Sequence, residues 1–167
     1  GLKPTYVKAA FEYAYDELKK ENVQDKVTLF YNDYDTYFSV DDELALISYI
    51  NEGEKAKICG GIGMQSHVDI KRPTLEEYGN ALKAFINAGL EVQITELDIT
   101  INFDTDDTDG RTPSYGYKNE KETDADQAAF TKDFIKQIVD IQKNRNEIIS
   151  PKGITGITVW GISDQTS

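Results

Sequence analysis

Side chains capable of acid–base or nucleophilic chemistry come directly after short apolar runs in this sequence. Glu96 and Asp98 end one such run, and Gln65 and His67 end another. Two carboxylates beside an imidazole can exchange protons or attack an electrophilic carbon, provided that folding brings them together. Trp160 stands near the end of a further apolar run, and an aromatic ring at such a place suits the apolar face of a sugar.

Glu96 is the candidate catalytic carboxylate. Ile94 precedes it and Leu97 follows it, and an ionised carboxylate in apolar surroundings needs hydrogen-bond or charge partners. His67 and Asp98 are the candidates to orient and tune it. A structural salt bridge is the alternative interpretation of Glu96, but polar residues at several strand ends favour catalysis.

His67 is the single histidine of the chain, and a structural role is an equally good interpretation of it. One histidine cannot by itself form a histidine-rich zinc site, and we predict no metal and no other cofactor. Ser66 beside His67 invites comparison with a hydrolase triad, but adjacent residues on a strand point to opposite faces, which argues against this pair. Trp160 has a core position as its alternative, and Cys59 is predicted to be a buried apolar residue without a catalytic role.

The apolar runs predict buried parallel strands, and the segments between them have helical spacing. We expect strands over Val27–Tyr31, Gly60–Gln65, Glu91–Leu97 and Gly156–Ile162. We expect helices over Pro4–Lys20, Asp41–Glu52 and Asp124–Lys143, and one that begins at a Thr74–Glu77 capping box and ends near Gly89. This alternation predicts a parallel sheet with helical crossovers, in which ligands bind at the carboxyl ends of the strands.

Side-chain alternation along these strands predicts which residues share a face. Val92, Ile94, Glu96 and Asp98 fall on one face of their strand, and Gln65 and His67 share a face of theirs. If these faces point inward, the candidate residues and Trp160 converge at the carboxyl ends of the strands. Asn32 and Tyr34 follow the first strand and belong to the same edge of the sheet.

The composition is that of a folded chain and excludes some partners. The 167 residues have a formal net charge of −12, which argues against binding to nucleic acid and to anionic membrane surfaces. No apolar run is long enough to span a bilayer, and one cysteine cannot form an internal disulfide. The acidic segment from roughly Asn102 to Thr123 resembles a calcium loop only loosely, lacks its ligand spacing, and is expected to be a solvated surface loop.

Four segments of the sequence resemble the strand motifs of family 10 glycoside hydrolases, which are mainly endo-β-1,4-xylanases with a (β/α)8 barrel. They are Leu29–Tyr34 (LFYNDY), Gly61–His67 (GIGMQSH), Ile94–Ile99 (ITELDI) and Ile157–Asp164 (ITVWGISD). The resemblance implies that Glu96 is the nucleophile of a retaining mechanism and that His67 and Asp98 hydrogen-bond to it and orient it. It implies substrate contacts for Asn32, Tyr34, Gln65 and Trp160, with xylan or xylo-oligosaccharide as the substrate.

The resemblance also implies that part of the barrel lies outside residues 1–167. The family's acid/base glutamate belongs to an Asn-Glu pair on the fourth barrel strand, whereas Asn51-Glu52 and Asn146-Glu147 lie in or after predicted helices. Asp35 stands where the family more often has Asn. We therefore expect residues 1–167 to supply the C-terminal half of the catalytic domain, strands five to eight, and the N-terminal half to be its partner as a separate or lost segment.

Two other functions remain open on the sequence alone. The chain could be a non-catalytic carbohydrate-binding fragment of such an enzyme, or a complete small doubly wound α/β domain with an unrelated ligand at its strand ends. Because polysaccharide does not enter the cytoplasm, the xylanase resemblance implies a secreted, periplasmic or cell-surface location.

Overall fold

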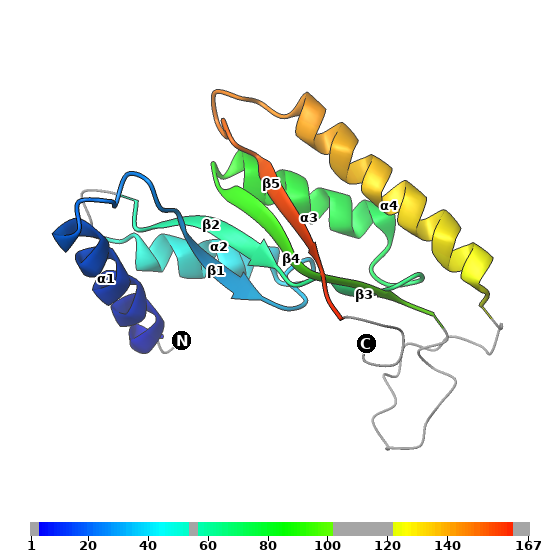
Figure 1. The fold of residues 1–167 in the computed structure, drawn as a ribbon, viewed down its shortest axis with the longest axis horizontal. Helices are drawn as coiled ribbons and strands as arrows, with labels where there is room; N and C mark the ends of the chain where they lie inside the picture. Colours follow the sequence, from blue (N-terminus) through cyan, green and yellow to red (C-terminus); the bar gives the residue numbers. More distant parts are fainter. Residues whose placement is uncertain (1–3, 54–56, 102–121, 162–167) are drawn as a thin grey trace, which may run out of the picture.

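The computed structural model describes residues 4–53, 57–101 and 122–161, in which helices and strands alternate as predicted except that two strands follow each other between α2 and α3. The elements are α1 (Thr5–Lys20), β1 (Leu29–Asp33), α2 (Val40–Ile50), β2 (Cys59–Met64), β3 (His67–Asp69), α3 (Leu75–Asn87), β4 (Glu91–Thr100), α4 (Asp124–Asn144) and β5 (Ile154–Val159) (Figure 1). No helix in the described ranges has both the length and the apolar character that a membrane span requires.

All pairings between the strands are parallel, and β4 is the centre of the sheet. β1 pairs with β2, β2 with β4, and β5 with the other edge of β4. The short strand β3 was not predicted, and it pairs with the end of β4. Met64 of β2 lies opposite Ile94, and His67 of β3 lies opposite Asp98, so β2 and β3 are two parts of one interrupted strand.

Ser66 explains the interruption between β2 and β3. Its φ angle of 65° lies in the left-handed region, which ends the extended backbone of β2. The side chain turns into the core, where its hydroxyl lies 2.6 Å from the hydroxyl of Tyr78 and 3.2 Å from the carbonyl of Met64. Ser66 and His67 therefore point apart, as predicted, and do not form a hydrolase pair.

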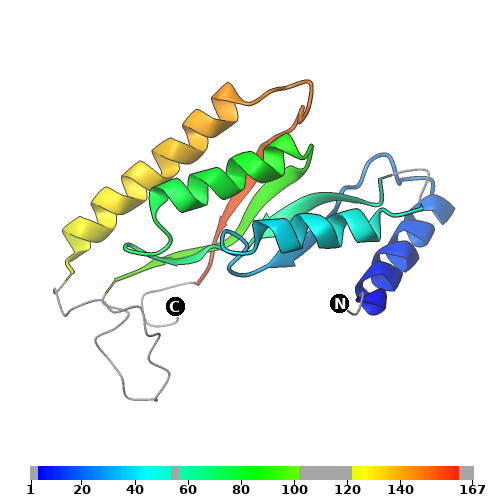
Figure 2. The same ribbon diagram turned by 180° about the vertical axis from the view of Figure 1, so that it is seen from behind.

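Helices α2, α3 and α4 cover one face of the sheet, and the core lies between them and the strands (Figure 2). The fully buried residues of this core come from both layers: Ile62, Met64, Val92 and Ile94 from the strands, and Tyr78, Leu82, Phe85 and Phe134 from α3 and α4. The helical spacing of the α3 residues places them on one stripe. The predicted capping box is present, because Thr74 Oγ1 accepts from the Glu77 amide and Glu77 Oε2 accepts from the Thr74 amide.

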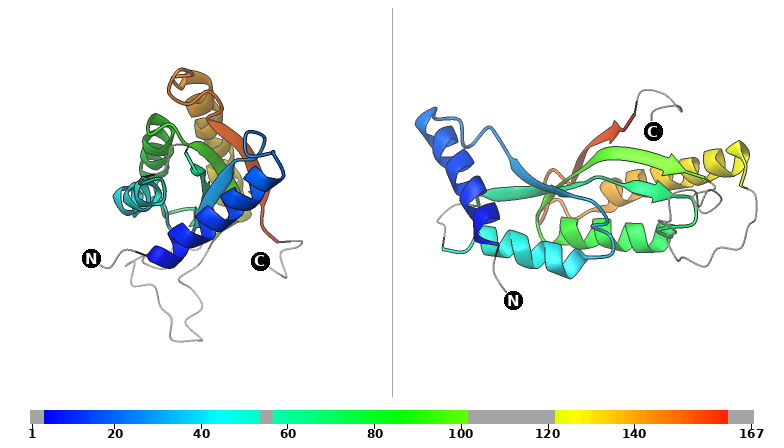
Figure 3. Two further views of the ribbon diagram at one scale, coloured as in Figure 1. Left: turned by 90° about the vertical axis from the view of Figure 1, so that its left-hand side faces the viewer. Right: turned by 90° about the horizontal axis from the view of Figure 1, so that it is seen from below.

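The opposite face of the sheet carries none of these three helices, and β5 lies along its edge (Figure 3). A closed (β/α)8 barrel has helices outside and packed side chains inside, so this face corresponds to part of a barrel interior. A doubly wound sheet carries helices on both faces, and the small doubly wound alternative is therefore not supported.

Candidate active site

The candidate residues meet on the open face, at the carboxyl ends of the strands. Glu96 and Asp98 lie in the second half of β4, His67 begins β3, and Asn32 lies near the end of β1. Trp160 follows β5 directly, because that strand spans Ile154–Val159 and so begins and ends earlier than predicted. Parallel strands place these ends at one edge, as the alternation of elements predicted.

His67 bridges the two carboxylates of β4. Its Nε2 atom lies 3.4 Å from Glu96 Oε2, and its Nδ1 atom lies 3.1 Å from Asp98 Oδ2. A neutral imidazole in this position can donate to one of the two carboxylates, and a protonated imidazole can donate to both. The register of the sheet produces the arrangement, since His67 pairs directly with Asp98.

Buried groups hold His67 in this position. The Tyr37 hydroxyl lies 3.1 Å from the backbone carbonyl of His67 and 2.8 Å from Asp35 Oδ1. Tyr37 itself is 8% exposed and packs against the ring of Tyr78. Because the start of β3 is tied to the core, the imidazole is presented by a rigid element and not by a free loop.

The second oxygen of Glu96 faces an amide. Asn32 Nδ2 donates to Glu96 Oε1 over 3.4 Å, and Thr95 Oγ1 donates to Asn32 Oδ1 over 2.6 Å. Both oxygens of Glu96 therefore have a polar partner, His67 on one side and Asn32 on the other. Thr95 was not among the predicted site residues.

The prediction that Val92, Ile94, Glu96 and Asp98 share one face is wrong. Val92 and Ile94 are fully buried in the core, whereas the side chains of Glu96 and Asp98 are 21% and 20% exposed and turn to His67 on the open side. The pairing of β4 with β5 shifts in register between Ile94 and Leu97. Such an irregularity breaks the alternation, which is why the neighbours Thr95 and Glu96 both contact Asn32.

The remaining predicted residues lie around this cluster. Trp160 is 52% exposed, and its ring stands edge-on to His67 with the ring centroids 6.2 Å apart. The backbone of Gln65 contacts the backbone of Glu96, because the Gln65 carbonyl accepts from the Glu96 amide over 3.0 Å. Tyr34 follows the end of β1 and is 64% exposed. Within the part of the chain that the structure describes, Trp160 is not a core residue, so that alternative is wrong.

Two other chemistry-bearing features lie away from this cluster. Cys59 is fully buried at the start of β2, as predicted, and burial raises the pKa of its thiol. Among the described residues no group of three or more His, Cys, Asp or Glu side chains is arranged to hold a metal ion. The acidic segment that was expected to be a solvated loop lies outside the described residues except for its last two positions.

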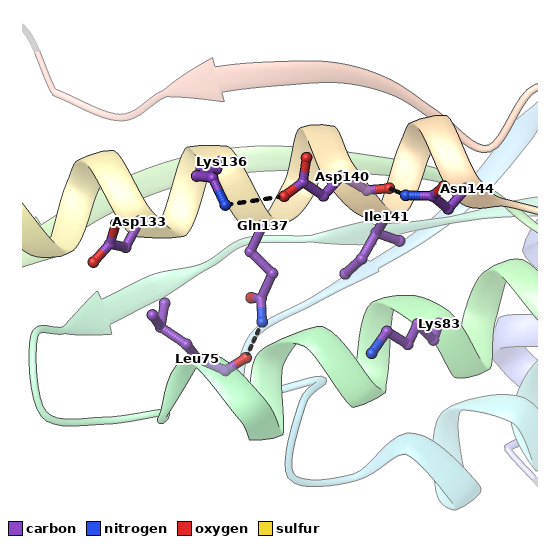
Figure 4. A pocket seen from close by; sticks show the side chains of 8 residues that line it. All are labelled: Leu75, Lys83, Asp133, Lys136, Gln137, Asp140, Ile141 and Asn144. Atoms are coloured by element: carbon purple, nitrogen blue, oxygen red, sulfur yellow. Dashed lines mark hydrogen bonds and ion pairs between the residues drawn. The ribbon is translucent and has the colours of Figure 1, made fainter.

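A hollow on the helical side lies between α3 and α4 (Figure 4). Gln137 Nε2 donates to the Leu75 carbonyl over 2.7 Å, which ties α4 to the first turn of α3. Lys136 pairs with Asp140 at 3.3 Å, and Asn144 donates to the Asp140 carbonyl over 2.8 Å. Only the Gln137 contact joins the two helices, because Lys136, Asp140 and Asn144 all belong to α4, and the hollow lies on the opposite side of the sheet from Glu96.

Comparison with known proteins identifies the family. The chain matches Glycosyl hydrolase family 10 over residues 1–167. It is 52% identical to endo-1,4-beta-xylanase A of Butyrivibrio fibrisolvens over 101 residues, which are 60% of this chain and 24% of that protein. It is 32% identical to endo-1,4-beta-xylanase A of Xylanibacter ruminicola over 172 residues, covering 99% of this chain and 44% of the relative. The chain thus spans less than half the length of these relatives.

Solved structures of the same family match the fold. The N-terminal endo-1,4-beta-D-xylanase 10B of Clostridium thermocellum, complexed with xylohexaose, matches with a TM-score of 0.69 and 28% identity over 97% of this chain and 27% of its own. Native xylanase10C from Cellvibrio japonicus matches with a TM-score of 0.69 and 25% identity over 100% of this chain and 32% of its own. The parallel strands and their helices are therefore part of a (β/α)8 barrel, in which β2 and β3 together form one strand. With its sequence match, its fold and its strand-end motifs in agreement, the chain belongs to glycosyl hydrolase family 10.

Proposed function

We propose that this chain supplies the nucleophile and the surrounding substrate contacts of a retaining endo-1,4-β-xylanase. The observation that carries the proposal is the position of the Glu96 carboxylate, held between His67 Nε2 at 3.4 Å and Asn32 Nδ2 at 3.4 Å. A nucleophile must approach the anomeric carbon along one direction, and two fixed partners restrict the rotation of this carboxylate. The relatives of this chain are endo-1,4-beta-xylanases, which supports xylan as the substrate.

In the proposed mechanism Glu96 attacks the anomeric carbon of a xylose unit as the glycosidic bond breaks. A covalent glycosyl-enzyme forms, and water then hydrolyses it with overall retention of configuration. His67 and Asp98 hold the attacking carboxylate, since the imidazole contacts both side chains. Trp160 offers its exposed ring to a sugar face, and Asn32, Gln65 and Tyr34 complete the substrate contacts. The reaction requires no cofactor.

The proposed mechanism needs a second carboxyl group about 5–5.5 Å from the nucleophile to act first as acid and then as base. Asp98 is tied to His67 at 3.1 Å and lies on the same strand as Glu96, so it is not placed to protonate a leaving group across the sugar. We propose that the acid/base glutamate comes from the N-terminal half of the barrel. That half would pair with the edge strands β1 and β5 and so enclose the open face of the sheet.

The proposed substrate is a neutral polysaccharide, which a net charge of −12 does not repel. Solved relatives are complexed with xylotriose and xylohexaose, which supports recognition of a linear chain of xylose units. We propose no nucleic-acid partner and no membrane partner. Because a polysaccharide substrate does not enter the cytoplasm, we further propose a secreted, periplasmic or cell-surface location.

The test is turnover in a completed barrel. This chain would be joined to the N-terminal half of the Butyrivibrio fibrisolvens relative, and the release of xylo-oligosaccharides from xylan would be measured. Glu96→Ala is expected to lower kcat by about four orders of magnitude or more, as removal of a covalent nucleophile does in other enzymes. Glu76→Ala, which changes an exposed carboxylate on α3, is the matched control and should leave the rate unchanged.

The same experiment decides on the second candidate, a carbohydrate-binding fragment without activity. The exposed Trp160 beside His67 favours it, because an aromatic ring alone can bind a sugar face. Binding of xylohexaose would be measured by calorimetry alongside turnover. Loss of turnover with retained binding in Glu96→Ala supports the enzyme, whereas binding without turnover in the unsubstituted barrel, abolished by Trp160→Ala, supports the fragment.

A further inference from the structure

The contact between Asn32 and Glu96 joins two strands that are not neighbours. β2 lies between β1 and β4 in the sheet. Asn32 of β1 nevertheless contacts both Thr95 and Glu96 of β4 across the open face of β2. The residue of β2 that pairs directly with Asn32 is Gly63, so the amide side chain crosses the sheet at this position.

Gly63 leaves the space that this crossing needs. A Cβ atom at residue 63 would overlap the amide of Asn32 and would lie 3.1 Å from Thr95 Cγ2. The atoms that it would meet first belong to the end of a flexible side chain, so an alanine here can be accommodated by displacing Asn32 without moving the backbone. The site therefore depends on the absence of a side chain at this one position of β2.

The chemistry of the three groups fixes the direction of the hydrogen bonds. An ionised carboxylate only accepts, so Asn32 must present its NH₂ group to Glu96. The amide oxygen then faces Thr95, whose hydroxyl lies 2.6 Å from it and donates. If the amide rotated by 180°, its oxygen would face the carboxylate and repel it. The carboxylate itself opposes that rotation, while the Thr95 hydroxyl, which could donate or accept, anchors the end of the Asn32 side chain in place.

We propose that Thr95 and Gly63 are positioning residues for the nucleophile: Gly63 admits the Asn32 side chain across β2, and Thr95 anchors the amide oxygen so that the NH₂ group stays within reach of Glu96. The role as nucleophile rests on the proposed function. The other group that faces Glu96 is His67 on β3, which Asp98 of β4 holds in turn. Substitutions at residues 63 and 95 leave those two side chains in place.

The test compares variants of the completed barrel that differ at the Thr95 hydroxyl. Thr95→Val removes the hydroxyl and keeps the shape. Thr95→Ala and Thr95→Ser form a matched pair that differs by a single oxygen, so it decides the matter even if the valine variant does not fold. Gly63→Ala displaces Asn32 from the other side. Two sets of quantities are measured: kcat and KM on xylohexaose, and the chemical shifts of the Asn32 side-chain NH₂ group by NMR.

Loss of the hydroxyl is expected to lower kcat about tenfold with KM changed less than about twofold, the size of effect that one hydrogen bond has. The Asn32 NH₂ signals should shift in the valine and alanine variants, because the amide loses the donor that anchors its oxygen. Thr95→Ser should restore both quantities to nearly the unsubstituted values. Gly63→Ala should resemble Thr95→Ala in both.

Equal kcat values and equal Asn32 NH₂ signals in the alanine and serine variants would overturn the proposal. So would a change in the melting temperature alone, since that is what a merely structural threonine would give. The NMR measurement needs no turnover. If the unsubstituted barrel does not cleave xylan, the proposed function fails, while the Asn32 NH₂ signals still decide whether Thr95 and Gly63 position the amide.

Discussion

Glu91, at the amino end of β4, gives a stability prediction that is independent of the reaction. Its carboxylate accepts from Lys152 at 2.7 Å, from Thr28 at 3.0 Å and from Thr155 at 2.9 Å. These partners come from β5 and from the segments before β1 and β5, so one carboxylate joins three parts of the sheet at the end opposite the site. The Glu91 side chain is 12% exposed, whereas that of Lys152 is 59% exposed.

The change that tests this network is Glu91→Gln, which keeps the size and removes the charge. A hydrogen bond to a charged group contributes about 1.5–3 kcal/mol, but the exposure of Lys152 weakens its share through solvent screening. Two neutral hydroxyl donors can still reach the glutamine oxygen. We therefore expect the free energy of unfolding at pH 7 to fall by about 1–2 kcal/mol.

The pH dependence has a definite sign. Burial by itself would raise the pKa of Glu91, but the hydrogen bonds from Lys152, Thr155 and Thr28 outweigh it, and the pKa lies below its ordinary value of 4.5. A carboxyl whose pKa is lower in the folded state stabilises the fold above the unfolded pKa, and this contribution disappears as the pH falls through the folded pKa. The difference between Glu91 and the Gln variant should therefore be full at pH 7 and shrink once the pH falls below about 4.5.

The assay is urea unfolding of the completed barrel at a series of pH values between 7 and 3, for the unsubstituted protein and for Glu91→Gln. Lys152→Met alone and combined with Glu91→Gln completes a double-mutant cycle, which isolates the coupling between the two side chains. Equal unfolding midpoints at pH 7 would refute the reasoning. A difference that grows toward acidic pH would refute it as well, because that is the sign expected of a carboxyl with a raised pKa.

Three further changes test the elements that position the site. Ser66→Ala leaves the buried Tyr78 hydroxyl without its partner at 2.6 Å and should lower the free energy of unfolding by about 1–3 kcal/mol. The double variant that also carries Tyr78→Phe should lose less, and equal losses of the two variants in thermal unfolding would contradict this. Thr74→Ala removes the N-cap of α3 and should cost about 1 kcal/mol in chemical unfolding, which Thr74→Asp should largely recover. Asp98→Asn weakens the hold on His67 and should lower kcat about tenfold or more at unchanged melting temperature, and an unchanged kcat would exclude this role.

Much of the fold could be predicted because it depends on local patterns. The apolar runs and the helical spacing gave the order of elements, and the Thr74–Glu77 pair gave the start of α3, which the structure confirms. The short strand β3 was missed because it follows a left-handed residue, Ser66, whose type does not require that conformation. The resemblance to the family, drawn from four strand-end segments, agrees with the match over residues 1–167.

The residues that form the site could largely be predicted, but not all of the contacts between them. Glu96, His67 and Asp98 were expected together because parallel strands end at one edge, and the structure places them within hydrogen-bond distance. Thr95 was missed because strict alternation assigns neighbouring residues to opposite faces. The register shift between Ile94 and Leu97 turns both Thr95 and Glu96 toward Asn32.

That register shift connects the stability of the sheet to its chemistry. An unbroken β4 would keep Glu96 on the face of Val92 and Ile94, both fully buried, where an ionised carboxylate has no partners. The irregularity lets one strand bury apolar side chains in its first half and present a carboxylate on the open face in its second half. The first half is held by packing against α3 and α4. In the second half, Glu96 is held by His67 and by Asn32, whose side chain reaches it because residue 63 is a glycine. A substitution that restored regular pairing beyond Ile94 should thus preserve the core and remove Glu96 from His67.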